Sequence, residues 1–390
     1  MSSLGIYIHW PWCKTICPYC DFNVRKFKNI DILEWEKAYI KEIYNMSFFA
    51  KEKKVSSIYF GGGTPSLIEP SLLEKIINCI NKNFLLSPSA EITIEANPSS
   101  IEYIDLFNFK QAGINRLSLG IQSLNDQHLK FLGRDHNSEQ AKKSLKYAEK
   151  IFNKSNLDII YGLPEQNITK FKSELSNMLT YAASLGHLSI YQLTIEPKTP
   201  FYKDFISGRL TPPPEEILSE MYYIIQEETE RNNLSQYEIS NHALPGNESI
   251  HNLGYWRYNE YLGIGPGAHS RVVNNSSRMA IVQINSPKNW LNSIQNNGNG
   301  IAIKEVLEQN EAAMEVLITG LRLEEFLPSE RFDQYSVLKL SEIVKISQIK
   351  ELIDGGFIEC KNSKIKTTNK GKSVLNSIIE RFDQIINSEH

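Results

Sequence analysis

Residues 5–20 read GIYIHWPWCKTICPYC, an apolar and β-branched run followed at once by three cysteines, Cys13, Cys17 and Cys20. The run predicts a buried strand, and the cysteines lie on the loop that follows it. Three thiolates on one short loop can each bind one iron of a [4Fe–4S] cluster, which leaves the fourth iron free for a small molecule. The spacing therefore predicts a cluster with an open position, which is a site for cofactor chemistry.

The same cysteines could instead bind zinc if the chain supplied a fourth ligand. His9 lies four residues before Cys13, so a Cys3His site is possible by ligand count. Structural zinc sites usually combine two short ligand loops, however, and the two other cysteines are isolated. Cys79 lies in an apolar helical run and Cys360 ends a short predicted strand, so we expect both to be core residues. The sequence therefore favours the cluster over zinc.

Length and composition indicate a globular protein with two domains. The chain has 390 residues, of which 41% are hydrophobic and 22% charged. A formal net charge of -3 gives no basic footprint for nucleic acid or for an anionic membrane. No apolar run is long enough to span a membrane, and we expect no signal peptide. Five cysteines, three of them clustered, fit a reducing compartment, so we expect a cytoplasmic location.

Short β-branched runs alternate with helical runs over the first half of the chain. They predict strands at 5–9, 57–60, 91–95, 116–120, 157–161 and 188–193, and helices at 32–49, 71–83, 101–112, 138–152 and 169–184. Repeated βα units of this kind form a parallel sheet, so the fold class is α/β. Polar and glycine-rich segments follow the strands. In a curved parallel sheet these segments share the carboxyl-end face, where sites form.

The motifs around these strands resemble the radical S-adenosylmethionine superfamily. The shared features are the CxxxCxxC loop after the first strand and GGGTP at 61–65 after the second. A narrower set resembles the branch that contains anaerobic coproporphyrinogen III dehydrogenase and the heme chaperone HemW. That set is IYIHWPWC (6–13), CPYCDF (17–22), YFGGGTPS (59–66), IEANP (94–98), RLSLGIQS (116–123), FLGRDH (131–136) and DIIYGLP (158–164). The resemblance implies a radical-SAM partial (β/α)6 barrel of the TIM type.

The resemblance also assigns cofactors and their residues. It implies a [4Fe–4S] cluster and S-adenosyl-L-methionine, whose amino and carboxylate groups the open iron would bind. Glycines at 61–63 would let the backbone approach the methionine part and bond its ends. Arg134 and Gln122 have a structural alternative, as helix caps or surface pairs. The positions that match cofactor contacts are Tyr7, Tyr19, Gly61, Gly62, Gly63, Thr64, Glu95, Gln122, Arg134 and Asp158.

Departures from the dehydrogenase pattern favour the chaperone branch. The dehydrogenase has a further cysteine where this chain has Phe22, and it has a long segment before its first strand, which begins here at about Gly5. HNLGYW at 251–256 reproduces the HNxxYW pattern of HemW. A neutral imidazole is a common ligand of heme iron, and aromatic rings can stack on the macrocycle. His251 is therefore a candidate heme ligand, and His269, at the end of a glycine-rich turn, is its rival.

The last part of the chain predicts a small separate domain. Residues 271–300 are rich in Asn and Ser and predict an irregular connection. Helices are expected at 311–321, around 338–340, and at 346–355 and 372–385, with a hairpin of 357–360 and 365–367. Such a set resembles a winged-helix-like α+β domain of the HemN type. We expect a barrel domain with its extension at 1–270, the connection at 271–300 and the C-terminal domain at 301–390.

The resemblance as a whole implies a protein that binds heme and delivers it to an acceptor hemoprotein, for example a respiratory one. One alternative is an enzyme that decarboxylates coproporphyrinogen III oxidatively, with a reductant such as flavodoxin or ferredoxin. Phe22 and the early first strand argue against that enzyme. The second alternative is a zinc-stabilised binding protein without radical chemistry. The cluster is predicted by the residues themselves, whereas heme delivery is implied by the resemblance alone.

Overall fold

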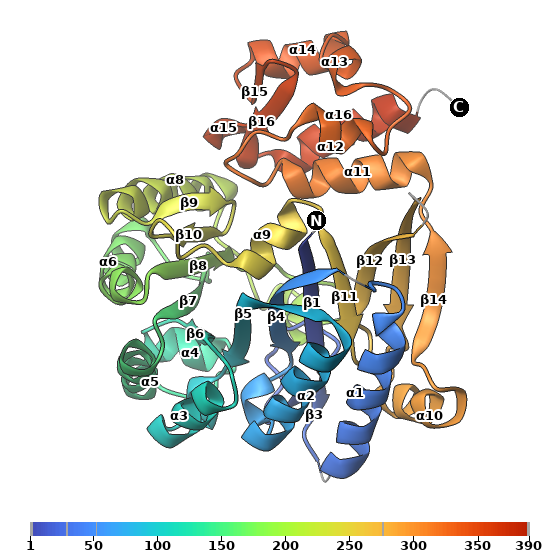
Figure 1. Ribbon diagram of the computed structural model, residues 1–390. Helices are drawn as coiled ribbons and strands as arrows, with labels where there is room; N and C mark the ends of the chain where they lie inside the picture. The colour runs from blue at the N-terminus through green and yellow to red at the C-terminus, as the bar shows by residue number, and fades with distance from the viewer. Residues whose placement is uncertain (1–2, 29, 52, 275–276, 388–390) are drawn as a thin grey trace.

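A computed structural model describes residues 3–28, 30–51, 53–274 and 277–387. Its centre is a curved twelve-stranded sheet in the order β14-β13-β12-β11-β1-β4-β5-β6-β7-β8-β10-β9 (Figure 1). The six predicted strands are confirmed as a parallel run, comprising β1 (Ser3–Trp10), β4 (Lys54–Gly62), β5 (Leu85–Ala96), β6 (Arg116–Gln122), β7 (Lys154–Tyr161) and β8 (His187–Gln192).

Helices connect these strands on the outer side of the sheet (Figure 1). The five predicted helices are confirmed as α1 (Ile32–Ser47), α2 (Pro70–Asn83), α3 (Tyr103–Gln111), α5 (Ser138–Ile151) and α6 (Ile168–Leu185). Further elements are β2 (Trp12–Cys13), β3 (Arg25–Lys26), η1 (Pro65–Leu67), η2 (Pro98–Ser100), α4 (Asp126–Phe131), α7 (Pro200–Ile206), α8 (Glu215–Arg231) and α9 (Ile250–Trp256). No helix among the described residues is long and apolar enough to cross a membrane.

Each parallel strand has an apolar outer row and a more polar inner row, because side chains alternate along a strand. In β6, Leu117, Leu119 and Ile121 are fully buried on the side that the helices cover. Burying each such side chain stabilises the fold by about 1.5–3 kcal/mol. Ser118 and Gln122 of the same strand line a cavity inside the barrel. The outer rows thus hold the sheet to its helices, while the inner rows are left for a site.

The sheet continues beyond the six predicted strands at both edges. β11 (Glu260–Ile264) pairs in parallel with β1, and an antiparallel set follows it: β12 (His269–Asn274), β13 (Ser277–Gln283) and β14 (Ile301–Val306). At the opposite edge, β10 (Asn241–Ala243) pairs antiparallel with β8, and β9 (Ser235–Glu238) pairs with β10. Residues 301–306, which we expected in the C-terminal domain, therefore belong to the large sheet.

The predicted irregular connection at 271–300 is wrong. Apart from 275–276, which lie outside the described residues, this segment holds most of β12, β13 and α10 (Pro287–Asn297). Val272 and Ile281 are fully buried in the sheet. Ser286 caps α10, and its Trp290 stacks on Trp35 of α1 with ring centroids 5.5 Å apart. The segment is rich in Asn and Ser, so its composition predicts a loop. Its few apolar side chains are nevertheless buried, because they pack against partners far away in the sequence.

The C-terminal domain has its own apolar core, which includes Leu317, Phe332 and Phe382. It sits above the sheet in Figure 1, with its first helix across β11 and β12. Arg271 and Glu315 form an ion pair at 2.7 Å that ties this helix to the sheet. The predicted helices and hairpin are confirmed here as α11 (Gln309–Gly320), α13 (Leu340–Ile343), α14 (Ser347–Asp354), β15 (Ile358–Lys361), β16 (Lys364–Thr367) and α16 (Leu375–Asn387). Two short helices that were not predicted, α12 (Ser329–Asp333) and α15 (Asn369–Lys372), complete the domain.

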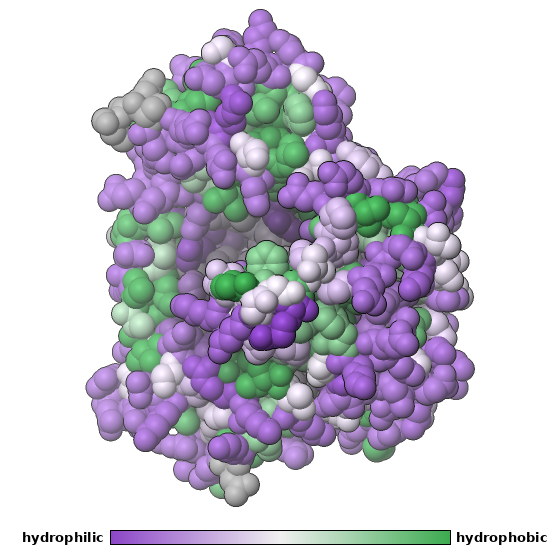
Figure 2. All heavy atoms as spheres, turned by 180° about the vertical axis from the view of Figure 1, so that it is seen from behind, coloured by the Kyte–Doolittle hydropathy of each residue, from purple (hydrophilic) through white to green (hydrophobic). Residues whose placement is uncertain are grey.

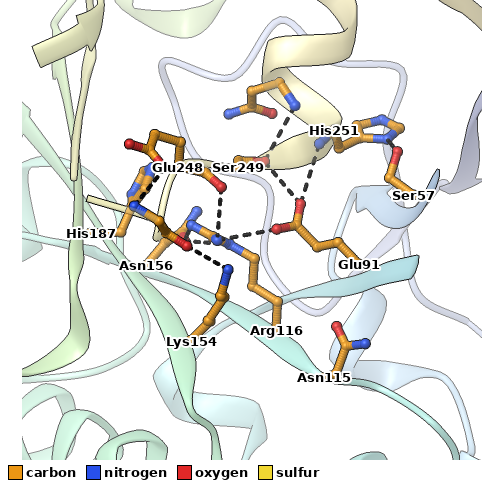
Figure 3. A network of polar contacts seen from close by, with 12 residues as sticks. Ser57, Glu91, Asn115, Arg116, Lys154, Asn156, His187, Glu248, Ser249 and His251 are labelled. Carbon is orange, nitrogen blue, oxygen red and sulfur yellow. Dashed lines mark hydrogen bonds and ion pairs between the residues drawn. The ribbon is translucent and has the colours of Figure 1, made fainter. Parts of the chain in front are cut away.

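A buried ion pair fixes α9 inside the barrel (Figure 3). Arg116 and Glu91 lie 3.2 Å apart, with side chains only 1% and 3% exposed. Asn156 Oδ1 accepts two further hydrogen bonds from the guanidinium, at 2.9 and 2.5 Å. Glu91 Oε1 accepts hydrogen bonds from the Ser249 hydroxyl and from the backbone N–H of His251, at 3.3 and 3.2 Å. The start of α9 is therefore held by a carboxylate that the barrel buries.

Replacing Glu91 with Gln should destabilise the fold strongly, because Arg116 would stay buried without a carboxylate. Breaking a buried pair in this way costs about 3–5 kcal/mol. Urea unfolding of Glu91→Gln measures the loss. The control is Glu36→Gln, which removes a more exposed pair with Lys75 at 2.8 Å, and we expect it to cost less than about 1 kcal/mol. Equal, small losses in both variants would contradict the anchoring role.

Candidate cofactor and ligand site

A cavity of about 450 Å³ lies at the carboxyl ends of the parallel strands. Seen from behind, the surface is deeply hollowed below the C-terminal domain (Figure 2). All three clustered cysteines line this first cavity. The candidate cofactor residues that also line it are Tyr19, Gly62, Gly63, Thr64, Glu95, Gln122, Arg134 and Asp158. Segments that are far apart in the sequence therefore meet at one place, as the loop positions predicted.

The cysteine loop presents three thiols to the first cavity. Burial, and to a smaller extent the neighbouring thiols, raises the pKa of Cys20 to about 11, and burial also raises the pKa of Cys13. Arg134 places a guanidinium nitrogen 3.5 Å from Cys17 Sγ. Three thiolates this close together need a positive partner, which a metal centre supplies. Three cysteine thiols that line one cavity are the donor set that would bind three irons of a [4Fe–4S] cluster.

His9 is not free to complete a zinc site. Its Nε2 lies 2.9 Å from the Asn23 carbonyl oxygen, and its Nδ1 lies 3.0 Å from the Tyr7 hydroxyl. Burial lowers the pKa of His9, which fits a neutral ring that donates through Nε2 and accepts through Nδ1. A Cys3His zinc site would have to break one of these hydrogen bonds. Protein contacts thus already satisfy the one histidine that the zinc alternative required.

The glycines at 61–63 let the cysteine loop lie directly against β4. Gly62 has a φ of +108°, and a Cβ there would lie 2.6 Å from the His9 ring. A Cβ on Gly63 would lie 3.0 Å from Cys13 Sγ. The Gly63 N–H donates to the Trp10 carbonyl at 2.7 Å, and the Gly62 N–H donates to Glu95 at 3.2 Å. Two of the N–H groups that we assigned to the cofactor are therefore already paired within the protein.

Two partly buried carboxylates, Glu95 of β5 and Asp158 of β7, line the first cavity. Burial raises the pKa of Glu95 to about 7 and the pKa of Asp158 to about 6. The Tyr59 hydroxyl donates to Glu95 at 2.9 Å, and the Ser118 hydroxyl donates to Asp158 Oδ2 at 2.6 Å. Asp158 Oδ1 is buried without a hydrogen-bond partner among the described residues. An open acceptor of this kind fits a ligand that brings hydroxyl donors, such as a ribose.

Arg134 and Gln122 are inward-facing and do not form surface pairs. The Arg134 Nη2 donates to the Gly120 carbonyl at 2.8 Å, while its Nε is buried and finds no partner in the described part of the chain. Gln122 adopts a φ of +68°, which turns the end of β6 toward the first cavity. Backbone strain at a cavity wall is typical of ligand sites. Tyr19 lies beside Phe201, with ring centroids 6.3 Å apart.

A second cavity, of about 640 Å³, lies between the barrel and the C-terminal domain. Phe22, Gly62 and Glu95 line both cavities, so the two adjoin. The second cavity also receives residues from β1, α9, β11, β12 and α11, namely Tyr7, Tyr255, Trp256, Tyr258, Tyr261, His269, Arg271, Glu315, Ile318 and Thr319. Tyr7 thus lies in this second cavity and not in the first. Among the sequence signals only HNLGYW and His269 pointed here, because the other walls come from distant segments.

The two candidate heme ligands lie in different surroundings. His251 is 2% exposed and lines neither the first nor the second cavity. Its Nδ1 lies 2.9 Å from the Ser57 hydroxyl, and burial lowers its pKa to about 3. His269 is exposed and lines the second cavity. No hydrogen bond to its ring is found within the described ranges of the chain.

Comparisons with known proteins agree with this architecture. Residues 7–175 match the family described as the Radical SAM superfamily, and residues 307–374 match the HemN C-terminal domain. The solved structure of coproporphyrinogen III oxidase (HemN) from Escherichia coli has a TM-score of 0.80 and 21% identity, and the match covers 98% of this chain and 91% of that one. The predicted fold, a radical-SAM barrel with a C-terminal domain, is confirmed.

Sequence relatives extend over nearly the whole chain. Heme chaperone HemW from Escherichia coli is 33% identical over 388 residues, which are 98% of each protein. The mitochondrial radical S-adenosyl methionine domain-containing protein 1 from Danio rerio is 34% identical over 384 residues, 96% of this chain and 86% of the relative. This chain therefore belongs to the radical S-adenosylmethionine superfamily and, within its coproporphyrinogen III oxidase-like family, to the HemW subfamily.

Proposed function

We propose that this protein is a heme chaperone that binds a [4Fe–4S] cluster, S-adenosyl-L-methionine and heme, and that delivers heme to an acceptor hemoprotein. The observation that carries the proposal is the pair of adjoining cavities, one faced by three thiols and the other walled by aromatic rings. The match to relatives named heme chaperones supports it. The cytoplasmic location expected from the sequence stays a prediction.

Different residues of the first cavity would bind the cluster and S-adenosyl-L-methionine. Cys13, Cys17 and Cys20 would bind three irons, and Arg134 would place a positive charge beside them. Glu95 would accept from the ammonium group, and the open Oδ1 of Asp158 would accept from a ribose hydroxyl. When bound, the cluster can supply an electron for cleavage of the cofactor. The protein's own part is to bind, orient and charge-balance these groups.

A second candidate function is oxidative decarboxylation of coproporphyrinogen III. The fold shared with HemN is the observation in its favour, and at 21% identity this likeness supports the fold alone. Phe22 stands where the resemblance to the dehydrogenase implies a cysteine, and it lines both cavities with 63% of its surface exposed. The aromatic ring would give the junction an apolar contact in place of a thiol.

The cluster can be tested through its ligands. After anaerobic reconstitution we expect about four irons and four sulfides per chain, and Cys17→Ser should lose most of both. Cys79→Ser is the control, because Cys79 lies on α2 and lines neither cavity. Iron, sulfide and zinc analysis of the three proteins measures the difference. Zinc without sulfide in the unaltered protein would contradict the cluster.

The affinity for S-adenosyl-L-methionine should depend on pH through Glu95. Because burial raises its pKa to about 7, this carboxyl gains a proton as the pH falls through 7 and stops accepting as a carboxylate. We expect the affinity to fall about fivefold to tenfold between pH 7.5 and pH 6. Glu95→Gln should bind weakly and show a flatter pH profile. Calorimetry checks this, and equal affinity of both proteins at pH 7.5 would argue against contact with Glu95.

The two candidate functions differ in what the reconstituted protein does with each tetrapyrrole. We expect a change in the heme absorption spectrum on mixing with heme, and transfer to an apo-hemoprotein added later. With coproporphyrinogen III, S-adenosyl-L-methionine and reduced flavodoxin, we expect no decarboxylated product. Product analysis by chromatography and heme spectroscopy measure the two arms. Decarboxylation without heme binding would replace the chaperone by the enzyme.

A further inference from the structure

We infer that heme binds in the second cavity, between the barrel and α11, with His269 as its iron ligand, and that His251 only positions α9. The inference rests on the proposed heme binding and names its site. It separates the two histidines that the sequence left as rivals.

The walls of the second cavity suit a large flat ring. Tyr255 and Tyr261 meet edge to face, with ring centroids 4.5 Å apart. Tyr7 and Trp256 also line the cavity, as does Ile318 of α11, which has 47% of its surface exposed. Aromatic and aliphatic side chains contribute most of the binding energy for a planar apolar ligand. With a volume of about 640 Å³, the cavity is of the size usual for ligands of this class.

His269 offers a free imidazole at this cavity. It is the first residue of β12, and its ring makes no hydrogen bond within the described residues. Burial of part of the ring, together with the positive charge of Arg271, lowers the pKa of His269. The neutral form, which is the form that binds iron, is thereby favoured. Arg271 lies on the same face of β12, so a cation accompanies the imidazole.

His251 lacks the room that a macrocycle needs. Its Nε2 has no hydrogen-bond partner among the described residues, but the ring is enclosed. Tyr59 stacks on it at 4.9 Å, and Tyr255 meets it edge-on at 4.6 Å. The small cavity that His251 lines has a volume of about 10 Å³, enough for at most one water molecule. A heme macrocycle does not fit into a cavity of that volume.

The contacts of His251 give it a structural role in the HNLGYW segment, in place of a role as heme ligand. Its backbone N–H donates to buried Glu91, and its Nδ1 pairs with Ser57 of β4 (Figure 3). The His251 ring also packs edge to face against the ring of Tyr255. Tyr255 and Trp256 are thus held at the second cavity by a histidine that does not enter it. His251 is a positioning residue.

Heme titrations of three reconstituted proteins test the assignment. His269→Ala should bind ferric heme about tenfold more weakly or worse, with a changed absorption and electron paramagnetic resonance spectrum. Added imidazole should restore the original spectrum, which a merely structural role would not produce. His251→Gln should keep the spectrum of the unaltered protein while its urea midpoint falls.

A second pair of variants tests the cavity without touching a histidine. Ile318→Glu should weaken heme binding, whereas Ile303→Glu should not, because Ile303 is also 47% exposed but lies on β14 outside both cavities. An unchanged spectrum and affinity in His269→Ala would overturn the assignment. So would loss of the iron ligand in folded His251→Gln. Failure of the unaltered protein to bind heme would instead remove the proposed function itself.

Discussion

The contact between the cysteine loop and the end of β4 sets the positions of all the groups around it. The Gly63 and Thr64 N–H groups donate to the carbonyls of Trp10 and Trp12, at 2.7 and 2.9 Å. Such an approach is possible only without a side chain at Gly63, since a Cβ there would lie 2.7 Å from the Trp12 oxygen. Larger residues would push the thiols away from the barrel. Because Gly62 also binds Glu95, the same contact fixes the carboxylate that faces both cavities.

The parts of this fold that sequence reasoning predicted are those with a local signal. β6 alternates Leu117, Leu119 and Ile121 with small or polar residues, and that pattern is enough to place a strand and its two faces. The loops after such strands must meet at one end of a parallel sheet, so the position of the first cavity could also be predicted from the sequence. α10 was missed because its burial depends on Trp290 meeting Trp35 across more than half of the chain.

The second cavity was even harder to predict from the sequence, because it too is formed by contacts between distant segments. Its walls are supplied by the first strand, a short helix, two later strands and a helix of the other domain. No spacing rule relates Tyr7 to Ile318. The sequence pattern did find His251, but it could not tell an iron ligand from a residue that anchors a helix, since both are histidines beside aromatic rings. Burial of His251 and the small volume of the cavity that it lines favour the positioning role that we propose for it.

Phe22 connects the chemistry of the two cavities. It is the residue at which this chain departs from the dehydrogenase pattern, and 63% of its surface is exposed at the junction. When a ligand covers an apolar ring that is exposed to water in a cavity, burial of that ring contributes about 1 kcal/mol or more to the free energy of binding. A thiol at this position would offer a hydrogen-bonding and reactive group to the same space. A phenylalanine at this position offers apolar contact in place of that reactivity, which fits the proposed role of holding a tetrapyrrole without altering it.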